Sequence, residues 1–108
     1  MKIVTSNEGD CRVVAIHGSA DVNASERLRE ALLGAIESGA TRIICDLGQA
    51  DFIGSDSLSI LIMAYLKARG RGGFVRLANP QARVREILDE MRLDRLFEVY
   101  RDVKCAAR

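Results

Sequence analysis

The chain has 108 residues, and its 16 Lys and Arg against 15 Asp and Glu give a formal net charge of +1. This length suits one domain over residues 1–108, and 48% hydrophobic with 29% charged residues is typical of a globular protein. The near-neutral charge argues against binding to nucleic acid, which needs a cationic surface. Residues 60–66, the longest apolar stretch, fall far short of the roughly 20 residues of a membrane helix, and residues 1–8 contain no apolar signal-peptide core. We therefore expect a cytoplasmic protein without direct membrane insertion.

The first elements expected are two strands, over residues 2–6 and 11–16, joined by a polar turn into an antiparallel hairpin. Residues 17–21 break the strand pattern. A helix then extends to about Ser38, since apolar residues recur at helical spacing. Asn23 or Ser25 is the expected N-cap.

The central elements are an apolar strand over residues 41–47, typical of an inner parallel strand, a loop over residues 48–54, and a second helix. This helix begins near Ser55 or Ser57 and ends at the glycines of residues 70–73. Its predicted core stripe is Leu58, Leu61, Ile62, Tyr65 and Leu66.

Ile60 and Met63 lie opposite that stripe and form either a partner-binding face or a second buried side. A strand over residues 74–78 follows, and Asn79-Pro80 is expected to cap a third helix that continues to about Met91. Residues 93–100 are a closing apolar segment in which a further strand is one option.

The alternation of strands and helices predicts an α/β fold with a single four- to five-stranded sheet. The sheet should be mixed but mostly parallel, because strands joined through helices return in the same direction. The N-terminal hairpin forms one edge, and helices pack against the sheet.

The sequence offers little for catalysis. His17 is the only histidine, so no side chain stands out as a general base, and residues 70–73 lack the Gly-Lys-Ser/Thr ending of a phosphate-binding loop. Cys11, Cys45 and Cys105 are widely spaced, without a Cys-x-x-Cys pair. We expect reduced thiols, two of them packed in strands, with an intermolecular disulfide or a reactive thiol as the alternative. We expect no metal, no cofactor and no enzymatic activity.

The most informative stretch covers residues 51–58. Ser55, Asp56 and Ser57 follow Gly54 where an inner strand leads into the second helix. Ser and Asp are common N-caps, so one interpretation is purely structural. The other is a functional hydroxyl, because function in open α/β sheets gathers at the carboxyl ends of the strands.

At this point the whole chain resembles a STAS domain of the free-standing anti-sigma factor antagonist type. Phe-Ile-Gly-Ser-Asp-Ser-Leu at residues 52–58 resembles that family's Phe-Ile/Met-Asp-Ser-Ser/Thr-Gly-Leu motif. Gly-Ser-Ala-Asp at residues 18–21 is similar to its Gly-Glu-Leu-Asp turn. Further similarities lie at residues 43–47, 72–73 and 93–97, in the family's order and spacing.

The resemblance implies a protein-binding switch. Such antagonists bind an anti-sigma factor that has a histidine-kinase-like ATPase fold and is a serine kinase, and binding releases the sigma factor. The kinase inactivates the antagonist by phosphorylating a serine at the start of the second helix, and a metal-dependent serine phosphatase resets it. In ungapped register this serine is Ser55, with Ser57 as runner-up. The expected partner-binding residues are Asp21, Gly54, Ser55, Asp56, Ser57 and Ser59.

Gly54 replaces the aspartate that precedes the phosphorylated serine in the family motif, and Ser57 replaces a glycine. These departures keep a second reading open: a STAS subunit that is never phosphorylated, docked on a lipid-transport ABC complex, a sulfate transporter or a stressosome-like scaffold. A third reading, a nucleotide-binding enzyme, has no evident catalyst in the chain.

Overall fold

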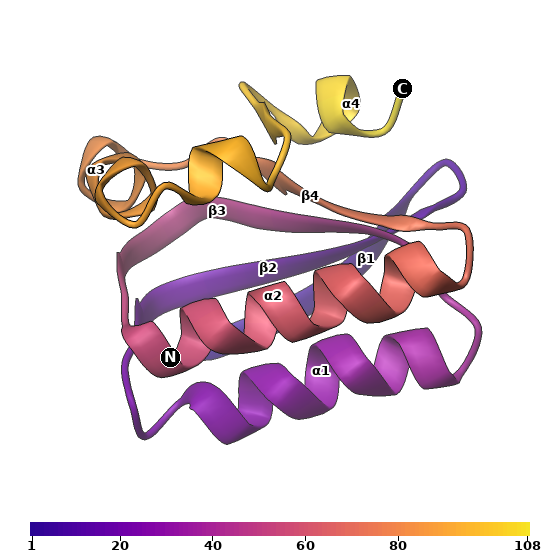
Figure 1. The fold of residues 1–108 in the computed structure, drawn as a ribbon, viewed down its shortest axis with the longest axis horizontal. Helices are drawn as coiled ribbons and strands as arrows, with labels where there is room; N and C mark the ends of the chain where they lie inside the picture. The colour runs from indigo at the N-terminus through magenta and orange to yellow at the C-terminus, as the bar shows by residue number, and fades with distance from the viewer.

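The computed structural model describes all of residues 1–108 and has one five-stranded sheet, in the order β1-β2-β3-β4-β5. β1 and β2 are antiparallel, and each later neighbour is parallel to the one before. This confirms the mixed α/β sheet with a hairpin at one edge (Figure 1). The elements are β1 (Lys2–Glu8), β2 (Cys11–Ala20), α1 (Ser25–Glu37), β3 (Arg42–Ile53), α2 (Ser55–Gly70), β4 (Phe74–Ala78), α3 (Ala82–Glu90), a 3-10 helix (Leu93–Arg95), β5 (Val99–Tyr100) and α4 (Val103–Ala106).

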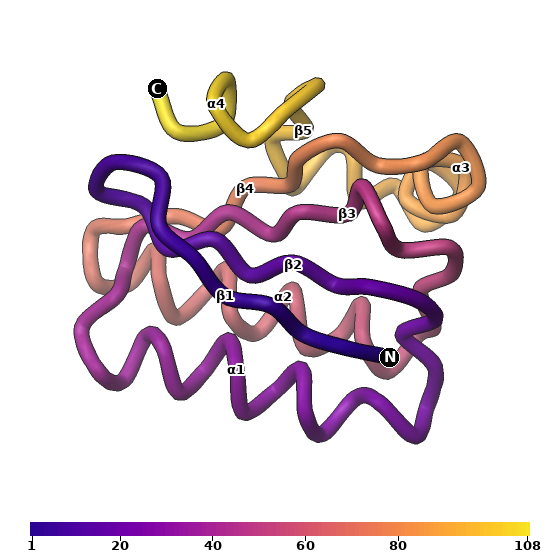
Figure 2. Tube along the Cα trace, turned by 180° about the vertical axis from the view of Figure 1, so that it is seen from behind, coloured from indigo at the N-terminus to yellow at the C-terminus, as the bar shows by residue number.

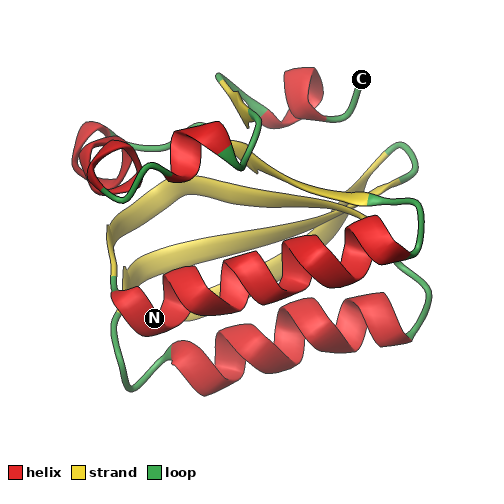
Figure 3. Cartoon of the chain, in the orientation of Figure 1, coloured by secondary structure: helices red, strands yellow, loops and turns green.

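The sheet separates two apolar clusters of unequal size. α1 and α2 lie side by side on one face, as Figure 3 shows, and the large cluster fills the space between them and the sheet. Its members with no exposed surface include Leu28, Leu32 and Ile36 of α1 and Leu61 of α2. The smaller cluster joins α4 to the sheet through Cys11, Val13, Ile44, Ala78 and Ala106.

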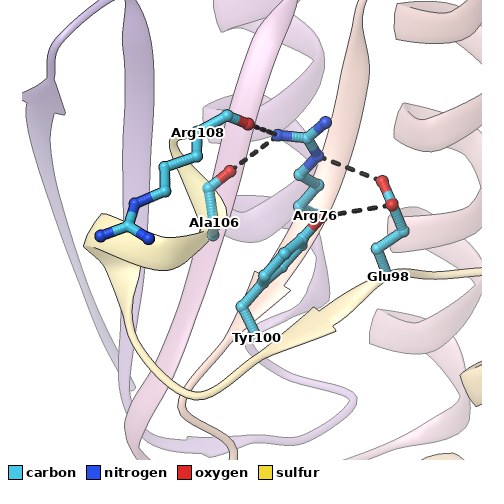
Figure 4. A network of polar contacts seen from close by, with 5 residues as sticks. All are labelled: Arg76, Glu98, Tyr100, Ala106 and Arg108. Atoms are coloured by element: carbon cyan, nitrogen blue, oxygen red, sulfur yellow. Dashed lines mark hydrogen bonds and ion pairs between the residues drawn. The ribbon is translucent and has the colours of Figure 1, made fainter.

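The C-terminal segment is anchored to β4 by Arg76. Its guanidinium donates to the carbonyl oxygens of Ala106, at 2.9 Å, and Arg108, at 2.8 Å, and to the Glu98 carboxylate at 3.2 Å (Figure 4). The same group stacks 3.7 Å from the centre of the Phe74 ring. One side chain therefore connects β4, the segment before β5 and the end of α4.

Both central strands are longer than predicted. β2 continues to Ala20 instead of breaking after Ile16, and β3 continues to Ile53 through the segment predicted as a loop. These extensions pair with each other, from His17 opposite Gln49 to Ala20 opposite Ile53, with register shifts along the way. The glycine and polar residues there disfavour a strand locally, and the hydrogen bonds between the two extensions override that preference.

The predicted N-cap of the first helix is wrong. Ala24 precedes α1, and no side chain caps it. The Asp21 carboxylate instead accepts the N–H of Asn23 at 3.0 Å, and the Ser25 hydroxyl donates to the carbonyl of Val22 at 2.9 Å. These local bonds stabilise the turn before the helix rather than its first N–H groups.

The predicted start of the third helix is also wrong, because α3 begins at Ala82 after Gln81 rather than at Asn79-Pro80. Asn79 has a φ of 56°, in the left-handed region that asparagine tolerates better than most residues. The Gln81 side chain donates to the carbonyl of Gly48 at 2.8 Å. This bond reaches β3 where its pairing with β2 shifts register, between Asp46 and Gln49, a feature that the local pattern did not reveal.

The predicted stripe on the second helix is partly wrong. Leu58 and Leu61 are buried as expected, whereas Leu66 is 57% exposed. Ile60 is buried, so it forms a second buried side, while Met63 is exposed. The reason is that α2 packs against both the sheet and α1, which widens its buried face beyond a single stripe.

Two further expectations, cysteines packed in strands and a strand in the closing segment, are confirmed. Cys11 and Cys45 are buried in strands, and all three cysteines are free thiols. The closing segment contains a short strand, Val99–Tyr100, after a 3-10 turn. None of the helices combines the length and the apolar character that crossing a membrane requires.

Candidate protein-interaction site at the start of α2

The carbonyl of Ala20 joins three elements at one end of the molecule. It lies at the end of β2 and accepts the N–H of Gly54, which follows β3, at 2.9 Å. It also accepts the hydroxyl of Ser57, in the first turn of α2, at 3.2 Å. In Figure 1 this is the end of the sheet from which both α1 and α2 begin. The start of α2 is therefore held against β2.

The two candidate serines differ sharply in exposure. Ser57 has 0% of its surface exposed, and its hydroxyl is occupied by Ala20. Ser55 is the exposed first residue of α2, and its hydroxyl makes no hydrogen bond within the chain. Asp56 and Ser59 are exposed as well, and Ser59 donates to the carbonyl of Ser55 at 3.0 Å.

No side chain caps α2, so the capping interpretation of residues 55–57 is wrong. Gly54 occupies the N-cap position with extended backbone angles, φ −89° and ψ 170°. The first N–H groups of a helix have no partner within it, and they favour negative charge nearby. The hydroxyl of Ser55 thus lies at a helix end suited to an anion.

Asp21 lies beside this helix start. Its Cα is 3.9 Å from the place a Cβ on Gly54 would occupy. The structure therefore brings together Asp21, Gly54 and Ser55, with Asp56 and Ser59 exposed on the adjoining turn of α2. Ser57 is the exception among the predicted partner-binding residues, since it presents no surface.

The sequence analysis did not predict two features near the start of α2. The Ser19 hydroxyl donates to the Asp51 carboxylate at 2.6 Å, across the irregular end of the β2–β3 pairing. Val22, beside Asp21, is 66% exposed. In the sequence, Val22 between two polar residues is only a weak indication of a contact surface. An exposed large apolar side chain indicates such a surface mainly where it lies beside other contact residues.

The side chains at this site do not form a metal-binding cluster. No group of three or more His, Cys, Asp or Glu side chains gathers in the structure closely enough to bind a metal ion. What the arrangement offers is an exposed hydroxyl, two neighbouring carboxylates and an exposed apolar side chain. Such a surface is suited to contact with another macromolecule.

Comparison with known proteins places the chain in a family. The model of the STAS domain matches residues 2–106. A candidate anti-sigma factor antagonist, BtrV, of Bordetella bronchiseptica is 23% identical over 107 residues, which are 99% of this chain and 92% of BtrV. The chain belongs to the STAS domain family.

Solved structures show the same fold. A candidate anti-sigma factor antagonist of Thermotoga maritima superposes with a TM-score of 0.90 at 19% identity, covering 96% of this chain and 90% of that one. The Bacillus cell fate determinant SpoIIAA, solved in its phosphorylated form, gives a TM-score of 0.72 at 20% identity, with 91% and 90% covered.

Proposed function

We propose that this protein is an anti-sigma factor antagonist, and that phosphorylation of Ser55 switches off its binding to an anti-sigma serine kinase of the histidine-kinase-like ATPase fold. The observation that carries the proposal is the contrast between two serines in one helical turn. Ser55 is exposed with a free hydroxyl, and Ser57 is buried with its hydroxyl bound to Ala20. A kinase can therefore reach the hydroxyl of Ser55 without unfolding α2. The names of the relatives support the same role.

Electrostatics support a switch that acts at the interface. A phosphate on Ser55 adds about −1.5 to −2 charges next to the carboxylates of Asp56 and Asp21. The uncapped start of α2 accepts that charge without refolding, because its N–H groups are free. A partner surface arranged for a neutral hydroxyl would meet repulsion and an unpaired charge, which weakens binding by about 2–5 kcal/mol.

The direct test incubates the full chain with ATP and an ATPase-fold anti-sigma kinase that binds it, followed by intact-mass measurement and peptide mapping. We expect one phosphate, on Ser55. Ser55→Ala should stay unmodified and bind the kinase with or without ATP. Ser59→Ala is the matched control, since it removes another exposed hydroxyl of the same helix and leaves Ser55 in place.

The outcomes separate the switch from the alternative. Phosphate on Ser59, or on no serine despite stable binding, would overturn Ser55 as the switch. Stable binding without modification would instead favour a permanently docked subunit, recovered with transporter components or a scaffold. A metal-dependent serine phosphatase that removes the phosphate from Ser55 and restores binding would complete the cycle.

A further inference from the structure

β1 leaves one long edge of the sheet without a partner. It is the first strand of the sheet and pairs only with β2, in an unbroken seven-residue register. Figure 2 shows β1 in front at this edge, with α1 lying below it. The strand contains no proline, and most of its residues are exposed. Proteins usually protect such an edge, because its unpaired backbone groups are a template for another strand.

The hairpin turn determines which backbone groups of β1 point outward. Gly9, with φ 58°, and Asp10 form a two-residue loop closed by Glu8 opposite Cys11. The closing pair of such a turn is hydrogen-bonded, and the pairs alternate from there along the strand. The outward N–H and C=O groups therefore belong to Ile3, Thr5 and Asn7.

These three residues are compatible with a second copy of the same strand. An antiparallel pair with its two-fold axis at Thr5 places Thr5 opposite itself and Ile3 opposite Asn7 of the second copy. All outward groups then find partners. A register shifted by two residues in either direction leaves some of them unpaired, so the two-fold at Thr5 makes the largest number of bonds.

The same register brings opposite charges together. It places Lys2 opposite Glu8 of the second copy, once at each end of the pair. Neither side chain forms an ion pair within its own chain. Both would occupy non-hydrogen-bonded positions, where facing side chains are closest. Val4, an apolar side chain that is 38% exposed, would be covered beside Ser6 of the second copy.

We propose that the protein forms a homodimer in which β1 pairs with β1 of a second copy, antiparallel about Thr5, so that the two sheets become one. The occupant is a second copy because the charges at the two ends of β1 are complementary only to the reversed strand. The dimer does not depend on the function proposed for Ser55.

Charge reversal tests the register. We expect the full chain to sediment as a dimer of about twice 11.9 kDa at micromolar concentration. Lys2→Glu makes both partners of each end pair carboxylates, and Glu8→Lys makes both of them ammonium groups. The dimer of each variant alone should therefore have a dissociation constant at least about tenfold higher than that of the wild-type dimer. Mixing the two variants should restore a dimer, because both end pairs then become attractive.

A backbone variant tests the pairing independently. Thr5→Pro removes the outward N–H of Thr5, which no bond within the hairpin uses, and edge strands tolerate proline at such positions. It should be monomeric with an unchanged circular dichroism spectrum, whereas Thr5→Ala should remain dimeric. A wild-type monomer up to about 1 mM would overturn the proposal. So would a dimer that both charge reversals leave intact.

Discussion

The Ser57 hydroxyl donates to the carbonyl oxygen of Ala20, a hydrogen bond of 3.2 Å between residues 37 positions apart. The same carbonyl accepts the N–H of Gly54 at 2.9 Å. Two donors, Gly54 between β3 and α2 and Ser57 in the first turn of α2, therefore meet one acceptor at the end of β2. This arrangement buries Ser57 and leaves Ser55 as the exposed serine at the beginning of the helix.

Replacing Ser57 tests that role. Ser57→Ala should lower the free energy of unfolding by about 0.5–1.5 kcal/mol, because it removes a buried hydrogen bond while Gly54 still satisfies the Ala20 carbonyl. Urea denaturation measures the loss, which corresponds to a melting temperature lower by about 4–8 °C per kcal/mol. Ser55→Ala, at an exposed position without a hydroxyl bond, should change stability by less than about 0.5 kcal/mol. Equal losses for both variants would contradict the division between a structural and an exposed serine.

Gly54→Asp should stabilise the start of α2. The N-cap position has extended backbone angles and lacks a capping side chain, and a new Cβ there would meet its nearest atom, the Ala20 oxygen, at 3.4 Å, an ordinary contact. An aspartate can accept a free N–H of the first turn, a gain of up to about 1 kcal/mol over glycine. Gly54→Ala is the control, since it adds the Cβ without an acceptor. An aspartate variant no more stable than the alanine variant would show that the first turn gains nothing from a side-chain acceptor.

Arg76 is expected to hold the C-terminal segment. Arg76→Gln removes donation to the carbonyls of Ala106 and Arg108 together with the stacking on Phe74. The substitution should lower the free energy of unfolding by about 1–3 kcal/mol, and the exposed ion pair with Glu98 should account for little of that loss. Hydrogen exchange should accelerate in residues 103–108 well before it changes in α1.

The control for this prediction is Arg76→Lys, which keeps the charge and loses the planar, multidentate donor. It should reproduce most of the increase in exchange if geometry rather than charge holds α4. Full protection of residues 103–108 in the lysine variant would assign the anchoring to charge alone.

Cys45 should resist thiol reagents until the protein unfolds. Burial, with the nearby Asp46 carboxylate, raises the pKa of Cys45 to about 12, so the neutral thiol is the form the fold accommodates. Because the folded pKa lies above that of the unfolded chain, its stabilising effect is complete below about pH 9 and is lost as pH rises toward 12. Pulsed alkylation at pH 8 should modify the partly exposed Cys105 first, with Cys45 reacting only in denaturant. Cys45→Ala should show less alkaline destabilisation than the wild type, after allowance for its lower starting stability.

Much of the fold is determined locally. The hairpin turn at Gly9, the helical spacing of α1 and α2 and the apolar run that begins β3 each depend on residues close together in sequence. Local patterns of this kind identify elements well and their ends poorly. The sequence also places the start of α2 near Ser55 or Ser57, where the helical repeat follows Gly54, and the structure has it at Ser55.

The ends of β2 and β3 required tertiary structure. Residues 17–20 and 48–51 contain glycine and polar residues that disfavour a strand locally, and they become strands because the two segments pair with each other. The same applies to Asn79, which has left-handed backbone angles and whose side chain lies close to Gly48 of β3. The sequence of one segment alone does not predict its pairing with a segment that is distant along the chain.

The serines at the start of α2 show the same limit at the site. The sequence alone determined that a cluster of short polar residues follows an inner strand and opens a helix, on a chain whose net charge of +1 one phosphate would reverse. Only the tertiary structure decided which hydroxyl is free. Ser57 donates to the carbonyl of Ala20 and is buried, whereas Ser55 is exposed, because helical rotation directs residues two positions apart to different faces.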